Sequence, residues 1–212
     1  MSAEWGPHTG TWLAWPHNKE HWPGKLESIP RVYCEIIRAL LEAGERVFLC
    51  VNDEKMGREA RNILALSKEE QEAVQFFHIP TDSSWMRDIG PMFVHKINSF
   101  LPGGAQRRRE ASEKSGFASS ERSRTYIINW IFNAWGGKYP PWDLDDKVPQ
   151  RISEQLKIPV TAPGIVFEGG SIDVNGKGTL LTTEQCLLNK NRNPNLSREQ
   201  IEKYLRDYLG AT

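Results

Sequence analysis

The chain of 212 residues is long enough for one large domain or two small ones, with ample length to bury an apolar core. Its 27 basic and 27 acidic residues balance, so no overall field favours nucleic acid or a membrane surface. No apolar run approaches the roughly 20 residues of a membrane span, and the three cysteines show neither zinc-site spacing nor a disulfide framework. We therefore expect a cytoplasmic, soluble protein.

Apolar periodicity in the first 96 residues predicts an alternation of strands and helices. Residues 29–43 carry apolar side chains at a helical period, and Gly44 is the expected stop. Asn52 or Asp53 can cap a second helix that runs to about Leu66. Short apolar runs predict strands at 11–15, 46–51, 74–79 and 92–95.

The segment 97–124 interrupts this alternation. It holds six Ser, three Gly and six basic residues against three acidic ones, with little periodicity. Such a composition buries too little apolar surface to offset the entropy of ordering, so we interpret it as a polar insertion or loop. Its Arg107, Arg108 and Arg109 could contact phosphate, but a solvated loop is the simpler interpretation.

Order resumes after the insertion. A helix is expected from Asp145 or Asp146 to Leu156, and a final helix from Ser197, which forms a capping box with Gln200. Strands are expected at 126–130 and 158–161, with a hairpin of 171–175 and 179–182. The pattern predicts an α/β fold divided into a first module, 1–96, the insertion, 97–124, and a second module, 125–212.

Two carboxylates stand out because each lies in a glycine-containing turn directly after an apolar run. Asp88 belongs to Ser84-Trp-Met-Arg-Asp-Ile-Gly-Pro in the first module, and Glu168 to Ile165-Val-Phe-Glu-Gly-Gly-Ser in the second. Glycine lets a backbone approach a ligand closely, and a carboxylate matches the fork of N–H donors of a guanidinium. We interpret Asp88 and Glu168 as groups that grip one planar cation, which indicates an enzyme acting on guanidino compounds.

Longer motifs extend from Ala3 to Gly210, apart from the insertion. Besides the turn around Asp88, they read Thr11-Trp-Leu-Ala-Trp-Pro-His, Asn129-Trp-Ile-Phe-Asn-Ala-Trp-Gly-Gly-Lys-Tyr-Pro-Pro-Trp-Asp, Glu168-Gly-Gly-Ser-Ile-Asp-Val and Thr182-Thr-Glu-Gln-Cys-Leu-Leu-Asn-Lys-Asn-Arg-Asn-Pro. In these residues the chain resembles the agmatine deiminases, which belong to the guanidine-modifying pentein superfamily and the bacterial-type peptidyl-arginine deiminases.

The resemblance implies a pentein fold, a fan of five α/β modules, of which about the first two would be present. It implies a hydrolase that converts agmatine and water to N-carbamoylputrescine and ammonia, in putrescine and polyamine biosynthesis, with no cofactor and no metal. A cysteine thiolate would attack the guanidinium carbon, and a histidine-activated water would hydrolyse the intermediate. Asp88 and Glu168 would be catalytic and substrate-binding, and Trp85 would lie beside the substrate, with plain core packing as its alternative role.

The family motifs that supply the histidine and the nucleophilic cysteine, Gly-His-x-Asp and Gly-Gly-Asn-x-His-Cys, do not occur in the chain. Cys34, Cys50 and Cys186 are interpreted instead as small apolar residues. We therefore expect a C-terminally truncated chain that is inactive alone and that self-associates or pairs with the missing modules. The alternatives are a related pentein deiminase acting on peptidyl-arginine or arginine, a non-catalytic guanidino-binding module, and a Trp-rich α/β domain without a ligand.

Overall fold

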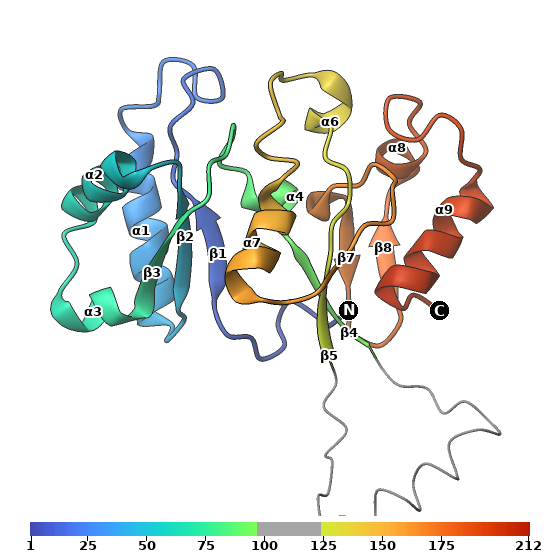
Figure 1. Ribbon diagram of the computed structural model, residues 1–212, viewed down its shortest axis with the longest axis horizontal. Coiled ribbons are helices and arrows are strands. Elements are labelled where there is room, and N and C mark those ends of the chain that lie inside the picture. Colours follow the sequence, from blue (N-terminus) through green and yellow to red (C-terminus); the bar gives the residue numbers. More distant parts are fainter. Residues whose placement is uncertain (97–123) are drawn as a thin grey trace, which may run out of the picture.

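The computed structural model describes residues 1–96 and 124–212, which form a row of three separate β-sheets with helices packed along them (Figure 1). The predicted insertion, apart from its last residue, lies outside the described residues. The fold is mixed α/β, and no sheet in the described part of the chain closes into a barrel. The longest helix in these two ranges has 14 residues, and none is long and apolar enough to cross a bilayer.

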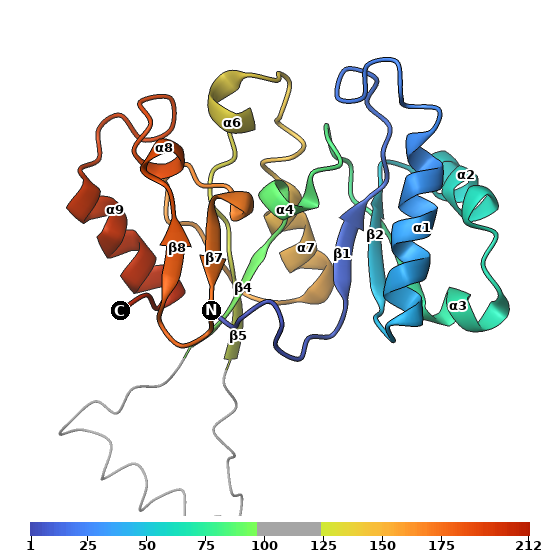
Figure 2. The same ribbon diagram turned by 180° about the vertical axis from the view of Figure 1, so that it is seen from behind.

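The first sheet is entirely parallel, with the order β1 (Thr11–Ala14), β2 (Val47–Val51) and β3 (Val74–His78). Parallel neighbours need crossover connections, and these are α1 (Ile29–Glu42) after β1 and α2 (Glu54–Leu64) with α3 (Lys68–Ala73) after β2. Figure 2 shows α1 lying against one face of this sheet. The buried face of α1 consists of Tyr33, Cys34 and Ile37, whereas Val32 and Ile36, which share the apolar period, are exposed.

The second helix begins as predicted but ends earlier. Asp53 caps α2 by accepting a hydrogen bond from the Met56 N–H at 2.8 Å. The helix stops at Leu64 because Ala65 adopts a left-handed conformation with φ 46°, and Ser67 then forms a capping box with Glu70 that opens α3. Residues 65–73 therefore form a turn and a separate short helix that the apolar pattern did not reveal.

The second sheet has the order β4 (Met92–Lys96), β5 (Arg124–Ile128) and β6 (Val160–Thr161), with β4 antiparallel and β6 parallel to β5. The sequence placed β4 in the first module, but this strand pairs with β5. The helix α7 (Val148–Leu156) connects β5 to β6. It begins two to three residues later than predicted, because Asp145 and Asp146 accept hydrogen bonds from other segments instead of capping it.

The third sheet is the predicted hairpin of β7 (Ile172–Val174) and β8 (Leu180–Thr182), followed by α8 (Glu184–Leu187). The predicted capping box of Ser197 and Gln200 opens α9 (Arg198–Tyr204), which continues into the π-helical turn η2 (Leu205–Leu209). Gly210 ends it with φ 75°, as expected of a C-terminal glycine. The described residues thus form three sheets, and the division into two α/β modules stays a prediction.

The sheets share cores. One cluster packs Ala14, Cys50 and Phe77 of the first sheet against Ile127 of β5 and Ile152 of α7. Another covers the second and third sheets and includes residues of α9 and η2. Apolar burial therefore holds the three sheets together as one body.

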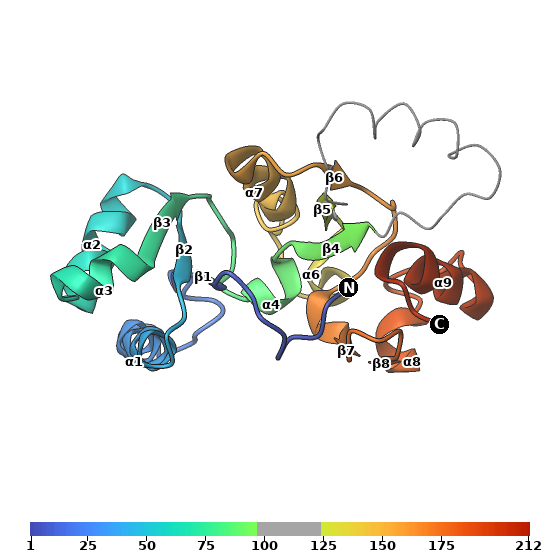
Figure 3. The same cartoon turned by 90° about the horizontal axis from the view of Figure 1, so that it is seen from below.

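Gly169 and Gly170 allow the second half of the chain to approach Arg87 and Asp88 in the first half. The short helix α4 (Met86–Ile89) follows β3, and η1 (Gly169–Ser171) precedes β7. Seen from below, α4 lies between the first sheet and the other two (Figure 3). A Cβ at Gly169 would lie 2.1 Å from the Arg87 carbonyl oxygen, so only glycine allows this approach.

We expect Gly169→Ala to lower the free energy of unfolding by about 1–3 kcal/mol, because the added methyl meets backbone that cannot move aside alone. Chemical denaturation measures this change. Gly57→Ala is the matched control, because a Cβ in α2 would meet its neighbours at ordinary contact distances of 3.4 Å or more. This control is expected to gain about 0.5–1 kcal/mol. Equal stability of the two variants would contradict the proposed close approach.

Candidate functional site

The structure brings the two predicted carboxylate turns into direct contact. Asp88 lies on α4, beyond the carboxyl end of β3, and Glu168 directly precedes η1. The Gly170 N–H donates to Asp88 Oδ1 at 2.9 Å. Figure 1 shows α4 at the upper end of the central strands and α6 (Ala134–Gly137) above it. The carboxyl ends of parallel strands are where α/β folds commonly bind ligands.

Asp88 is a half-buried carboxylate with donors on both oxygens. Besides the Gly170 contact, the Trp135 indole N–H donates to Oδ2 at 3.2 Å. Trp135 reaches this position through an unusual backbone, with φ 57° at its own residue and φ 51° at Ala134. Burial raises the pKa of Asp88 above its ordinary value, and the hydrogen bonds from Gly170 and Trp135 oppose that rise.

Glu168 is 3% exposed and forms a buried ion pair with Arg192. The Arg192 Nε–H donates to Oε1 at 2.6 Å, and Nη2 contacts the same oxygen. The other oxygen, Oε2, is buried and has no hydrogen-bond partner among the described residues. Arg192 follows α8, in a loop that no sequence argument had assigned to the site.

The segment that carries Trp85 and Asp88 is anchored to the loop before α7. Asp145 Oδ1 accepts the N–H groups of Asp82 and Ser83, at 2.8 and 3.1 Å. In return, Asp82 Oδ2 accepts the Leu144 N–H at 2.8 Å. Asp145 is 1% exposed, and this burial raises its pKa, against the opposing hydrogen bonds.

Trp85 is at the surface and not in the core. Its side chain is 38% exposed, and its ring lies 4.9 Å from the ring of Trp22. Its carbonyl accepts the Asp88 N–H at 2.9 Å, so Trp85 directly precedes the turn that presents the carboxylate. A partly exposed indole three residues before a carboxylate is of the type that can lie against a flat cation.

Two of the three cysteines, Cys34 and Cys50, are buried, and the third, Cys186 on α8, is partly buried. Cys50 lies in β2, where burial raises the pKa of its thiol to about 12, and burial also raises the pKa of Cys34 on α1. Neither a cysteine nor a histidine bonds to Asp88 or Glu168 in the described part of the chain. The same ranges contain no group of three acidic, histidine or cysteine residues placed to hold a metal ion.

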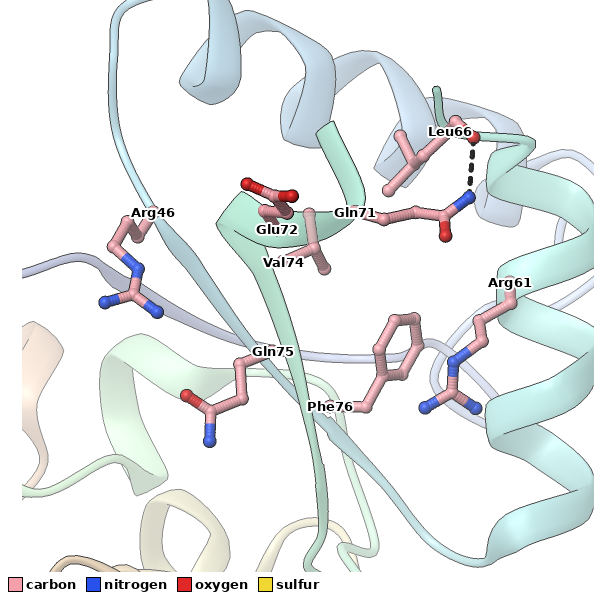
Figure 4. Close-up of a pocket in the computed structure, with 8 residues that line it drawn as sticks. All are labelled: Arg46, Arg61, Leu66, Gln71, Glu72, Val74, Gln75 and Phe76. Carbon is pink, nitrogen blue, oxygen red and sulfur yellow. Dashed lines mark hydrogen bonds between the residues drawn. The ribbon is translucent and has the colours of Figure 1, made fainter. Parts of the chain in front are cut away.

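Larger hollows lie away from the carboxylates. Figure 4 shows one of about 510 Å³ around β3 and α3, where Arg61 covers the Phe76 ring at 4.0 Å and the Gln71 amide donates to the Leu66 carbonyl at 2.9 Å. The hollow against Asp88 is only about 10 Å³, enough for one water at most. These residues therefore do not enclose a substrate-sized cavity behind Asp88.

A family model of the Porphyromonas-type peptidyl-arginine deiminases matches residues 1–212. Agmatine deiminases of Stutzerimonas stutzeri and Medicago truncatula are 36% and 38% identical to the chain, and each match covers 100% of this chain. The solved agmatine deiminase of Enterococcus faecalis superposes with a TM-score of 0.79 at 30% identity, covering 100% of this chain and 51% of that one. An agmatine deiminase of C. jejuni with substrate bound gives 0.77 at 27% identity, covering 99% and 53%. The chain spans about half the length of the curated relatives it matches, 50% and 51%.

We expect Asp145→Ala to lower the free energy of unfolding by about 2–4 kcal/mol, because it leaves one buried and one partly buried N–H donor without an acceptor. Asp145→Asn keeps an acceptor oxygen and removes a charge whose burial is costly, so at pH 7 it should be at least as stable as the unmodified chain. Chemical denaturation of both variants measures these changes.

The pH dependence follows from the raised pKa of Asp145. The folded state binds the proton more tightly, so the unmodified chain gains stability as the pH falls through that pKa. Any stability that Asp145→Asn gains over the unmodified chain should therefore shrink as the pH falls over this range. It should vanish below pH 3.8, the ordinary pKa of an aspartate. An advantage that grows on acidification would contradict this assignment.

Proposed function

The chain belongs to the Porphyromonas-type peptidyl-arginine deiminase family, and we propose that it carries the Asp88 and Glu168 part of an agmatine deiminase site. The reaction would hydrolyse the guanidinium of agmatine to N-carbamoylputrescine and ammonia. The observation that carries the proposal is the contact between the two carboxylate turns, which places Asp88 within one hydrogen bond of the residues that follow Glu168. We also propose that the three sheets belong to a pentein fan.

The role of Asp88 in this proposal is to hold the guanidinium. Gly170 and Trp135 orient its two oxygens and leave it partly exposed. No lysine or arginine lies within salt-bridge distance of Asp88 among the described residues, so its charge is available to an external cation. A charge-assisted hydrogen bond from a guanidinium is stronger than one between neutral groups.

Trp85 and Glu168 would complete the binding of the head group. The exposed indole of Trp85 offers a face to the planar cation, and Glu168 adds negative potential as charge shifts during the reaction. The nucleophile and the acid/base would be supplied by other chain, because the described partners of Asp88 and Glu168 are Trp135, Gly170 and Arg192, and these include no cysteine or histidine. We therefore propose that this chain alone is inactive.

A partner for the chain is part of the proposal. The third sheet has two strands where the others have three, and Leu181 on β8 is 69% exposed. An open strand edge is a template for pairing with further chain. We propose that the chain associates with itself or with the segment that corresponds to the other half of its relatives.

Isothermal titration calorimetry tests the binding proposal. We expect the chain to bind agmatine, and Asp88→Asn to raise the Kd at least tenfold, because the variant keeps the shape and loses the charge. Affinity should also fall as the pH drops through the raised pKa of Asp88, since the protonated acid does not attract a cation. Asp207→Asn, on the exposed surface of η2, is the matched control.

The same samples distinguish the related activities. Arginine and a peptidyl-arginine analogue carry a carboxylate or a peptide backbone that agmatine lacks, so tighter binding of either would favour a different deiminase. Ammonia release from agmatine should stay at the level without protein. Release by the chain alone that Asp88→Asn abolishes would contradict the proposed inactivity, and equal affinity of the Asp88 variant would contradict the proposed site.

A further inference from the structure

Arg192 and Glu168 form an ion pair whose geometry leaves one carboxylate oxygen unused. An arginine commonly binds a carboxylate with two parallel N–H groups, one to each oxygen. Here Nε and Nη2 both contact Oε1, and Oε2 has no partner among the described residues although it is buried. A buried charged oxygen without a partner is costly, so this arrangement needs an explanation.

The third nitrogen of the guanidinium is also occupied. The Arg192 Nη1–H donates to Asn191 Oδ1 at 2.8 Å. The side chain is 9% exposed, so it cannot turn toward solvent as a surface arginine does. The head group is therefore fixed, with its donors turned toward Oε1 and Asn191.

The backbone around Arg192 is fastened to the two segments that flank the site. Asn193 pairs with Val166 on both backbone groups, accepting its N–H at 2.9 Å and donating to its carbonyl at 2.8 Å. Asn133 donates to the Asn191 carbonyl at 2.9 Å. Gly136 has a φ of 89°, which favours glycine, and its missing side chain leaves room for the ends of the Asn191 and Arg192 side chains, which a Cβ would approach to 2.1 and 2.6 Å.

The charges around this pair leave one negative charge in excess. Glu168 and Arg192 compensate one another, and Arg87 is paired with Glu4. Burial raises the pKa of Asp88, and the charges of Arg87 and Arg192 oppose that rise. The three carboxylates Asp88, Glu168 and Glu4 and the two arginines together carry a formal charge of about −1, which matches a single guanidinium head group.

We propose that Arg192 is a positioning residue that holds Glu168 by Oε1 and presents Oε2 to the guanidinium of the substrate. The inference rests on the proposed function, because it assigns the unpartnered oxygen to the same head group that Asp88 binds. Arg192 does not touch the substrate. It fixes the direction of the second acceptor and prevents the two carboxylates from presenting two uncompensated charges.

Calorimetric titration of the whole chain with agmatine and with methylguanidinium tests this role, alongside the melting temperature. Arg192→Lys keeps the charge but loses the fork, so we expect a melting temperature within a few degrees of the unmodified chain and a Kd at least tenfold higher for both ligands. A similar loss for both ligands is expected, because Oε2 meets the part that they share. Arg198→Gln, which removes a surface arginine paired with Glu184, should bind both ligands unchanged.

Glu168→Gln supplies a second variant should the lysine variant fail to fold. Its amide oxygen can still accept from Arg192, while its NH₂ group takes the place of Oε2 and turns a donor toward the guanidinium. We expect at least a tenfold loss of affinity with the fold retained. If either folded variant bound agmatine and methylguanidinium as tightly as the unmodified chain does, the positioning role would be overturned, while the proposed function would remain. Absence of agmatine binding to the unmodified chain would instead remove the proposed function, and this inference with it.

Discussion

The hydrogen bond from the Gly170 N–H to Asp88 joins residues that are 82 positions apart, and the arrangement of the site depends on it. The contact requires α4, which follows the first sheet, to lie against η1, which links the second sheet to the third. Gly169 and Gly170 have no side chain that would separate them. The Trp135 indole then fixes the same carboxylate from the side of the second sheet. Asp145 holds the backbone of Asp82 and Ser83, in the segment that leads to Asp88.

Much of the fold followed from local signals in the sequence. The helical period of α1, the Asp53 cap of α2 and the Ser197 capping box each act within one or two turns, and the structure contains all three. The hairpin of β7 and β8 is equally local, because its turn residues lie next to the strands that they connect. The motifs around Asp88 and Glu168 likewise carried the resemblance to the family that the comparisons identified.

The remaining features depend on contacts between distant segments. Asp145 and Asp146 have the composition of a helix cap, yet their oxygens accept from Ser83 and Phe132, and α7 begins later for that reason. The pairing of β4 with β5 bridges the segment between residues 96 and 124, so periodicity alone could not assign it. Arg192 lies in the motif that begins at Thr182, but nothing in the neighbouring residues indicates that its partner, Glu168, is 24 residues earlier.

The hydrogen bond from Gly170 also makes its amide proton a reporter of the charge on Asp88 in NMR spectra. A backbone amide proton that donates to a carboxylate has a chemical shift that follows the charge on that carboxylate, and this one donates to Asp88 at 2.9 Å. In a spectrum of isotope-labelled protein, the Gly170 resonance would therefore report ionisation of the aspartate directly, without a dye or a coupled assay. Glycine amides fall in a separate region of such a spectrum, so the same residue that permits the close approach also makes it observable.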